Sequence, residues 1–306
     1  MRPTLALLVL LSLSCASPSL EPEAEAGSPQ ARLVVISPSA AEMLAEFGLT
    51  ERIVGVGDFV FRPVELTALP RVGSYNRPNV EQILELQCNV LITVRSDAAR
   101  ASNQRLRQLG VEVLELDTSQ WAGTRQALLA LGQRFDREGE ARRTLQSLDQ
   151  ALDRVRRMAE SSPRPGVLMV VGRDPLYVAG PGSHLDALIL AAGGRNVAAD
   201  SSSPYQLMSM EAMLQRLPDV IIDTSDNGPD AIRGRRAGPW ETWDFLPAVR
   251  NNQVFWVDPD RLVIPGIRLP AMAERMGRFL HPEVFGEPLA ADYEPEPAEM
   301  TIEEIP

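Results

Sequence analysis

Two stretches of the chain follow the same residue pattern and align without a gap. Residues 79–93 read NVEQILELQCNVLIT, and residues 209–223 read SMEAMLQRLPDVIID. Asn79 and Ser209 are typical helix N-cap residues, and a Glu follows each of them in the first helical turn. Each copy ends in an apolar run that is typical of a strand buried on both faces. The repeat therefore predicts that the fold uses one helix–strand unit twice.

The rest of the chain alternates between short apolar runs and amphipathic segments. Strands are expected at residues 33–36, 53–56, 111–116, 167–171, 220–223 and 254–257. Helices are expected at residues 37–47, 103–109, 121–135 and 268–280. Because strands that alternate with helices usually form parallel sheets, this order predicts an α/β fold with mostly parallel sheets.

Residues 137–162 predict one long amphipathic helix. Its apolar residues recur three and four positions apart and leave charge on the other positions. They are Leu145, Leu148, Leu152, Val155 and Ala159. Prolines at positions 163 and 165 end the helix. We therefore expect two α/β lobes, residues 31–136 and 163–286, joined by this single helix.

The two ends of the chain differ from the rest in composition. Residues 1–15 resemble a secretory signal peptide, with one Arg, an apolar run too short to span a bilayer, and small residues. The segment LSLSC resembles a bacterial lipobox, in which Cys15 would be lipidated and become the first mature residue. An ordinary signal peptide that is cleaved further along is the alternative. Residues 16–30 and 287–306 are acidic, and we expect a disordered linker and a disordered tail there.

The distribution of charge excludes several classes of function. The formal net charge is -11, but residues 16–30 hold three acids and no base, and residues 287–306 hold seven acids and no base. The part between them is nearly neutral, which gives no electrostatic basis for binding nucleic acid. All 30 basic residues are Arg, so Schiff-base catalysis and a P-loop lysine are excluded as well.

The residues that commonly perform catalysis or bind metals are few and scattered. His184 and His281 are the only histidines, and no cluster of carboxylates lies near them in the sequence. The segment DTSDNG begins like a calcium-binding loop, but Gly234 stands where that loop requires Glu. Cys88 precedes a predicted strand and is expected to be an inert core residue. We predict a protein that is not an enzyme and that has no cofactor or metal of its own.

Four segments, taken in order, resemble one family. They are RLVVISPSAAEMLAEFGLTERIVGVGDF, PRVGSYNRPNVEQILELQCNVLI, DPLYVAGPGSHLDALILAAGGRNVA and AVRNNQVFWVDPD. Together they look like the cobalamin and iron-siderophore group of substrate-binding proteins of ABC importers, and most like its cobalamin-binding members. The resemblance implies two lobes bridged by one long helix, a ligand cleft between the lobes, and export to the periplasm or cell surface, often with a lipid anchor. It also implies an ABC permease dimer with its ATPase subunits as the partner, and we expect a monomer.

The resemblance gives the repeated Glu a role. In this family a surface Glu on each lobe docks into an Arg cluster on one of the two permease subunits, and Glu81 and Glu211 occupy those positions. The alternative for either residue alone is a helix start, since an acid in the first turn is stabilised by the helix dipole.

The predicted ligand site rests mainly on aromatic residues. Tyr75, Tyr177 and Tyr205 lie in Gly-, Pro- and Ser-rich segments that are expected to be loops, where rings suit a ligand platform better than a core. The resemblance adds Phe59 and Asp260, of which the second matches a position that can hydrogen-bond ligand amides. Cobalamin binders of the family often have Trp at such positions, and none of the four Trp does so here. Ordinary loop aromatics remain the alternative.

These features predict a binding protein that captures cobalamin or a related corrinoid and delivers it to an importer. A ferric siderophore or haem is the alternative ligand, because four arginines flank the expected cleft and could meet anionic groups. They are Arg77, Arg95, Arg173 and Arg261. An enzyme or a chelatase-like domain on a similar fold is the alternative from another class.

Overall fold

The structure is a computed structural model that describes residues 31–226 and 231–294. The predicted signal peptide with Cys15, the acidic linker at residues 16–30 and residues 295–306 of the predicted tail lie outside this part of the chain. No helix in the described ranges is long and apolar enough to cross a bilayer.

The N-terminal lobe is built on a four-stranded sheet in which every pair is parallel. Its strands in spatial order are β2 (Ile53–Val56), β1 (Leu33–Val35), β5 (Val90–Val94) and β6 (Glu112–Leu116). Its helices are α1 (Pro38–Glu46), α2 (Val80–Glu85), α3 (Arg100–Gln108) and α4 (Trp121–Arg134). Leu33 and Val35 of β1 pack with α1 and α4. Val34 faces the other way and packs with Ile83 of α2 and Leu106 of α3, so helices cover both faces of the sheet.

The C-terminal lobe holds a seven-stranded mixed sheet. Its main path is β10 (Tyr205–Leu207), β8 (Leu176–Ala179), β7 (Gly166–Arg173), β11 (Val220–Asp223), β13 (Val254–Trp256) and β12 (Gly234–Arg235), and β9 (Arg195–Asn196) pairs with β7. The central strands β7, β11 and β13 are parallel, whereas β8, β10 and β12 run antiparallel to their neighbours. The expected parallel core is therefore extended by antiparallel strands.

Helices cover both faces of this second sheet as well. They are α6 (His184–Ala191), α7 (Met210–Arg216), α8 (Pro247–Arg250), α9 (Leu269–Leu280), α10 (Pro282–Phe285) and α11 (Ala290–Tyr293). Residues of α6 and α9 pack with Val167 and Ile222 on one face. Met213 of α7 and Ala248 of α8 pack with Ile221 on the other face.

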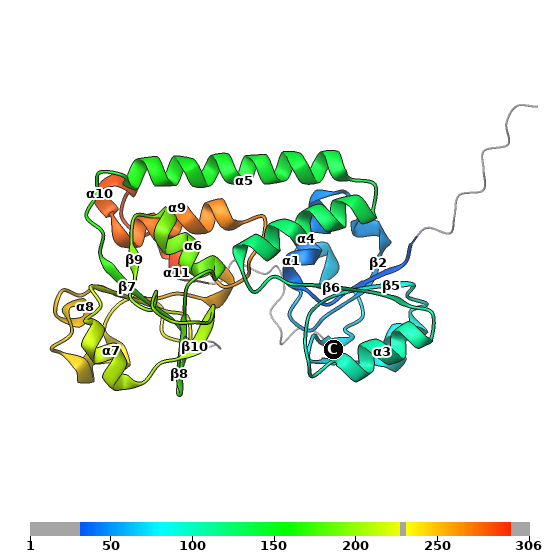
Figure 1. Ribbon diagram of the computed structural model, residues 1–306, viewed down its shortest axis with the longest axis horizontal. Helices are drawn as coiled ribbons and strands as arrows, with labels where there is room; N and C mark the ends of the chain where they lie inside the picture. Colours follow the sequence, from blue (N-terminus) through cyan, green and yellow to red (C-terminus); the bar gives the residue numbers. More distant parts are fainter. Residues whose placement is uncertain (1–30, 227–230, 295–306) are drawn as a thin grey trace, which may run out of the picture. The chain divides into compact units, whose positions relative to one another are not determined.

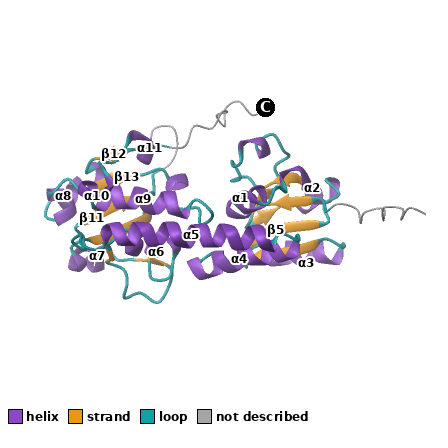
Figure 2. Cartoon of the chain, turned by 90° about the horizontal axis from the view of Figure 1, so that it is seen from above, coloured by secondary structure: helices purple, strands orange, loops and turns teal. Residues whose placement is uncertain are grey.

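The helix α5 (Glu138–Ala159) joins the two lobes and packs on both of them (Figures 1 and 2). Leu148 belongs to the core of the N-terminal lobe, whereas Leu152, one turn further on, belongs to the core of the C-terminal lobe. Figure 2 shows α4 and α9 beside α5 on the two sides of this division, and both helices contact it. The apolar stripe that predicted the long helix thus serves two cores in succession.

The prediction of a disordered tail over residues 287–306 is wrong for its first part. Residues 287–294 are described and end in α11. Asp292 is only 2% exposed and accepts hydrogen bonds from Arg275 and Arg278 of α9. The ring of Tyr293 lies 5.5 Å from the ring of Phe279. These contacts offset the entropy cost of ordering the segment. The acidic composition alone does not indicate such partners.

Candidate functional site

The repeated segments fold alike. Asn79 accepts a hydrogen bond from the backbone N–H of Gln82 at 3.2 Å, and Ser209 accepts one from Ala212 at 3.1 Å, so both predicted N-caps are present. Residues 79–90 and 209–220 match position by position in being buried, half-buried or exposed. Equivalent residues just after the two helices adopt the left-handed conformation, with φ of 52° at Gln87 and 43° at Leu217.

Glu81 and Glu211 occupy equivalent surface positions on the two lobes. Each is exposed in the first turn of its helix. Their helices α2 and α7 cover the faces of the two sheets that do not pack with α5. Hydrogen bonds from its own backbone N–H and from Ser209 hold the pKa of Glu211 below its usual value. Two carboxylates are therefore available to one partner that contacts both lobes from the side away from α5.

Tyr177 and Tyr205 lie on strands, which corrects their expected placement in loops. In the β8–β10 pair, Tyr205 stands opposite Ala179 and Tyr177 opposite Leu207. The side chain of Tyr177 is 39% exposed, and its hydroxyl donates to the Tyr205 carbonyl at 3.5 Å. The Gly- and Ser-rich flanks that suggested loops are the turns on either side of two short strands. The backbone pairing gives both rings fixed positions that a loop would not give.

Tyr205 is held by a buried histidine. Its hydroxyl lies 3.0 Å from Nδ1 of His184, and Nε2 of His184 lies 3.0 Å from the carbonyl oxygen of Leu262. A carbonyl can only accept, so Nε2 carries the proton and Nδ1 accepts from the Tyr205 hydroxyl. Burial lowers the pKa of His184 to about 4, and burial together with nearby Tyr177 raises the pKa of Tyr205. The imidazole is therefore neutral and orients the phenol.

The same histidine ties Tyr205 to the segment that carries Asp260. Asp260 lies in a short 3₁₀ turn, Pro259–Arg261, that follows β13, and Leu262 comes directly after it. Asp258 caps this turn by accepting from the Asp260 N–H at 3.0 Å. The carbonyl of Asp260 accepts from Arg268 at 3.1 Å. Tyr177, Tyr205 and Asp260 are thus brought together through bonded neighbours on the C-terminal lobe.

Phe59 and Tyr75 form a second group on the N-terminal lobe. Phe59 follows β2 and is 57% exposed, and Tyr75 is 40% exposed at the turn between β3 (Gly73–Ser74) and β4 (Arg77–Pro78). The N–H of Asp58 donates to the carbonyl of Gly73 at 3.1 Å, which joins the Phe59 loop to this hairpin. Large exposed rings are costly unless something covers them.

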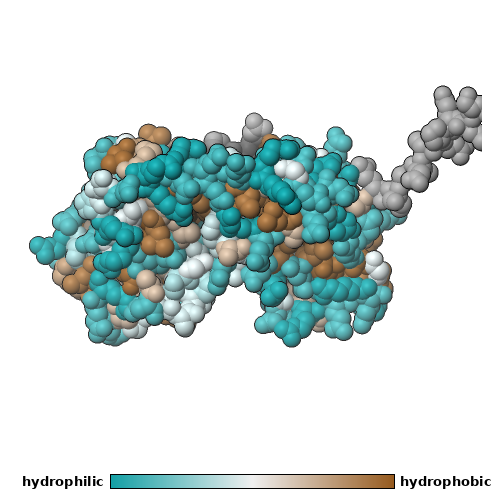
Figure 3. All heavy atoms as spheres, turned by 45° about the horizontal axis from the view of Figure 1, so that its top comes forward, coloured by the Kyte–Doolittle hydropathy of each residue, from teal (hydrophilic) through white to brown (hydrophobic). Residues whose placement is uncertain are grey.

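The five predicted ligand residues therefore fall into two groups, one on each lobe. Phe59 follows the carboxyl end of β2 and Asp260 follows that of β13, the edge at which open α/β sheets bind ligands. Figure 3 shows the surface indented between the two lobes. The lobes also meet through an ion pair of 2.9 Å between Glu42 of α1 and Arg268, in which Glu42 is almost fully buried. The arrangement suits a ligand with a broad apolar face and polar groups at its edge.

The four arginines expected around the cleft are not equivalent. Arg77 and Arg95 are exposed, and Arg95 lies 3.8 Å from Asp117. Arg173 is partly exposed and lies 5.1 Å from the centre of the Trp256 ring. Arg261 is buried, and its Nε donates to the backbone carbonyl of Glu294, so its expected place on the cleft wall is wrong. Its guanidinium is occupied within the lobe.

His184 is the residue that sequence reasoning missed. From the sequence alone, it is considered only as a catalytic or metal-binding residue. Its role depends on the pairing of β10 with β8, which brings Tyr205 to it from 21 positions away. A Ser–His pair after Gly-Pro-Gly identifies the capped start of α6, where Ser183 accepts from the Asp186 N–H, but nothing in that pattern identifies the tyrosine.

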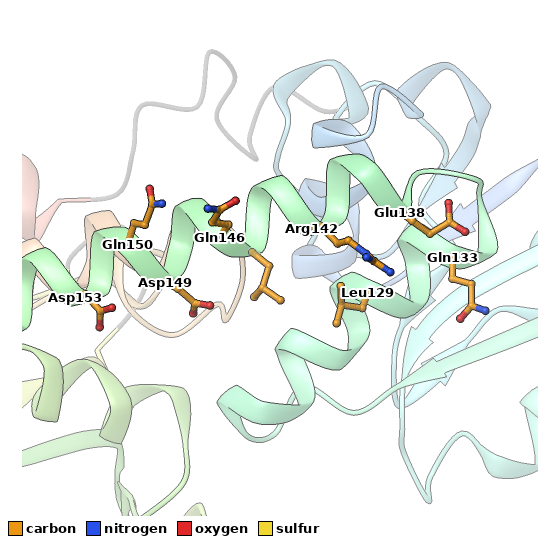
Figure 4. Close-up of a pocket in the computed structure, with 9 residues that line it drawn as sticks. Leu129, Gln133, Glu138, Arg142, Gln146, Asp149, Gln150 and Asp153 are labelled. Atoms are coloured by element: carbon orange, nitrogen blue, oxygen red, sulfur yellow. The ribbon is translucent and has the colours of Figure 1, made fainter.

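Other features of the surface and core do not add to this site. A groove of about 820 Å³ between α4 and α5 shares no residue with it (Figure 4). The groove is lined by Leu129, Gln133, Glu138, Arg142, Leu145, Gln146, Asp149, Gln150 and Asp153. Cys88 is buried, and burial raises its pKa to about 11, as expected of an inert core thiol. Among the residues that the structure describes, no cluster of three His, Cys, Asp or Glu side chains could hold a metal ion.

Comparison with known proteins identifies similar chains over most of this length. The family model "Periplasmic binding protein" matches residues 33–261. An uncharacterized ABC transporter substrate-binding lipoprotein of Bacillus subtilis is 24% identical over 84% of this chain and 82% of its own. A vitamin B12-binding protein of Vibrio cholerae is 26% identical over 82% of this chain and 90% of its own. The crystal structure of a periplasmic haem-binding protein of Pseudomonas aeruginosa is 27% identical, covers 84% of this chain and 94% of its own, and superposes with a TM-score of 0.73. These relatives are named for binding and transport, and none is named as an enzyme.

Proposed function

Since the chain belongs to the periplasmic binding protein family and is the substrate-binding protein of an ABC importer, we propose that it captures cobalamin or a related corrinoid in the cleft between its lobes. It then delivers the ligand to the permease dimer, which the ATPase subunits drive. The observations that support this proposal are the two groups of candidate ligand residues, Phe59 with Tyr75 on one lobe and Tyr177, Tyr205 and Asp260 on the other.

A corrinoid is supported by the chemistry of these groups. Its macrocycle offers a wide apolar surface to exposed rings, and its peripheral amides offer hydrogen-bond donors and acceptors to tyrosine hydroxyls and a carboxylate. Vitamin B12-binding relatives that match four fifths of the chain support the same ligand. Haem or a ferric siderophore is the alternative, supported by the similar haem-binding structure and by the exposed Arg95, which could meet a carboxylate of such a ligand.

Delivery is proposed to use the matched carboxylates. Glu81 and Glu211 sit at equivalent places on the two lobes, and a two-fold permease would present an Arg cluster to each. Lipidation of Cys15 is proposed to keep the protein at the membrane, on the periplasmic or cell-surface side.

The ligand is tested first on the protein purified from its native host. Corrinoid, haem and ferric catecholate have different absorption spectra, so a bound ligand identifies itself. A corrinoid spectrum, or titration with cyanocobalamin to a saturable end point, supports the proposal. A haem spectrum, or saturation with hemin and not with cyanocobalamin, transfers the proposal to the alternative ligand.

The position of the site is tested with Tyr177→Ala. Loss of an aromatic contact at an interface costs roughly 1 to 3 kcal/mol, so the Kd for the ligand that binds should rise about 5- to 150-fold. The matched control is Phe245→Ala. Phe245 is a 49% exposed ring that contacts Trp243, and Trp243 packs on the face of the C-terminal sheet away from α5. Equal effects of the two variants would reject the assigned cleft wall.

A further inference from the structure

The turn that carries Asp260 is held by the last described part of the chain. We propose that residues 287–294 form a strap that positions the Asp258–Arg261 turn, and with it Asp260, to receive the ligand. This inference rests on the proposed function for the role of Asp260, and on the structure alone for the contact between strap and turn.

The strap is anchored by a buried carboxylate. Asp292 is 2% exposed and accepts from Nε of Arg275 at 3.2 Å and from Nε of Arg278 at 2.6 Å. It also accepts from the Leu289 N–H at 2.8 Å, which closes the first turn of α11. Burial by itself would raise the pKa of Asp292, but hydrogen bonds from Arg278 and Leu289 and the charges of both arginines hold it below its usual value. A carboxylate so placed is costly to bury unless all of these partners remain.

Aromatic packing fixes the strap against the lobe. The ring of Tyr293 lies 5.5 Å from that of Phe279 in α9, at 38° between the ring planes. Phe279 in turn lies 4.9 Å from Phe255 of β13, the strand that leads into the turn. The strap therefore continues the core of the C-terminal lobe up to the carboxyl end of β13.

Residues of the strap form hydrogen bonds with both ends of the turn. The N–H of Asp258 donates to the carbonyl of Tyr293 at 2.8 Å. Nε of Arg261 donates to the carbonyl of Glu294 at 2.5 Å. Arg275, which holds Asp292, also donates from Nη1 to the carbonyl of Arg261 at 2.8 Å. Asp260 lies between these two attachment points.

Two explanations of these contacts differ in what they predict. A segment that only stabilises the C-terminal lobe would, on removal, weaken all of that lobe. A strap that positions the turn would, on removal, release the turn while the sheets stay intact. The bonds reach the turn directly, whereas the central strand β11 pairs with β7 and with β13 without any strap residue.

The test uses Asp292→Asn in the full chain, with Glu287→Gln as the matched control. Glu287 is an exposed acid in the same strap and loses the same charge. A second pair of variants ends the chain after Gly286 or after Glu294, so that only the first lacks the strap. Amide hydrogen exchange is measured without ligand for residues 258–263 and for Gly166–Arg173 of β7, a central strand of the same lobe. Affinity is measured for cyanocobalamin and hemin.

We expect exchange at residues 258–263 to quicken about tenfold or more in Asp292→Asn and in the chain ending at Gly286, with β7 unchanged. Affinity for the probe that binds should fall about tenfold in the same two variants and stay unchanged in the controls. Unchanged exchange at residues 258–263, or an equal increase in β7, would overturn the proposed role of the strap. If the unmodified protein binds neither probe, the proposed ligand is rejected, and the exchange data still decide whether the strap holds the turn.

Discussion

His184 should make the stability of the protein sensitive to mild acid. Burial lowers its pKa to about 4 in the folded protein, against 6.5 for a free histidine. The unfolded chain therefore binds a proton more readily than the folded one below about pH 6.5. The contribution of His184 to the free energy of unfolding is fully present above that pH, and it is lost as the pH falls towards about 4. The total loss is about 3 kcal/mol, because each pH unit of difference is worth about 1.4 kcal/mol.

Most of this loss should occur before the carboxylates contribute. With pKa values of 6.5 and about 4, lowering the pH from about 7.5 to about 5 costs about 2 kcal/mol. Paired carboxylates such as Asp292, whose pKa is lowered, lose their stabilisation only below the usual aspartate pKa of about 4. The range between these limits therefore reports mainly on histidine.

The measurement compares the unmodified protein with His184→Gln. Glutamine can accept from Tyr205 and donate to Leu262, and it does not titrate, so the variant should fold with a loss of about 1 to 3 kcal/mol at neutral pH. Urea unfolding is followed by tryptophan fluorescence at several pH values from about 7.5 to 5. The unmodified protein should lose about 2 kcal/mol more than the variant over this range. His281 is common to both proteins, so its contribution cancels. Equal pH slopes would show that His184 is not buried as a neutral partner of Tyr205.

Two further predictions concern the transporter and the membrane. Glu81→Arg with Glu211→Arg should abolish uptake with little change in ligand affinity, because like charges would face the permease arginines. The control is Glu138→Arg with Glu160→Arg, which makes the same charge change at exposed sites near the two ends of α5. Normal uptake by the Glu81→Arg, Glu211→Arg variant would reject the proposed docking surface. The Cys15→Ala variant should no longer be labelled by lipid, and it should either leave the membrane fraction or remain unprocessed. Membrane retention with normal processing would contradict lipidation of Cys15.

The sequence predicted most reliably what is local. The caps at Asn79 and Ser209 and the two buried strands that follow them depend on residues a few positions apart, and the structure has all of them. The long helix was predicted from its spacing, but the division of its apolar face between two cores, at Leu148 and Leu152, was not. That division depends on which lobe each residue meets.

What the sequence could not predict depends on contacts distant in the chain. The acidic composition of residues 287–294 indicated disorder, because the arginines that pair with Asp292 lie on another helix. Arg261 was expected at the cleft for the same reason, since only the folded strap occupies its guanidinium. Composition describes the cost of ordering a segment, whereas the partners that offset this cost are set by the tertiary fold.

The repeat extends further than its helix and strand. A tyrosine stands six residues before each repeated Glu, Tyr75 before Glu81 and Tyr205 before Glu211. Six residues span at most about 20 Å, so in each lobe one short segment carries both a proposed ligand ring and the proposed docking carboxylate. The two segments differ in how the ring is held. Tyr205 lies on a strand and is hydrogen-bonded to His184, whereas Tyr75 is 40% exposed at a hairpin turn. Under the proposed roles, the C-terminal lobe offers a preorganised wall of the site. On the N-terminal lobe, ligand binding would order the Tyr75 ring, which costs up to about 1.5 kcal/mol of binding free energy.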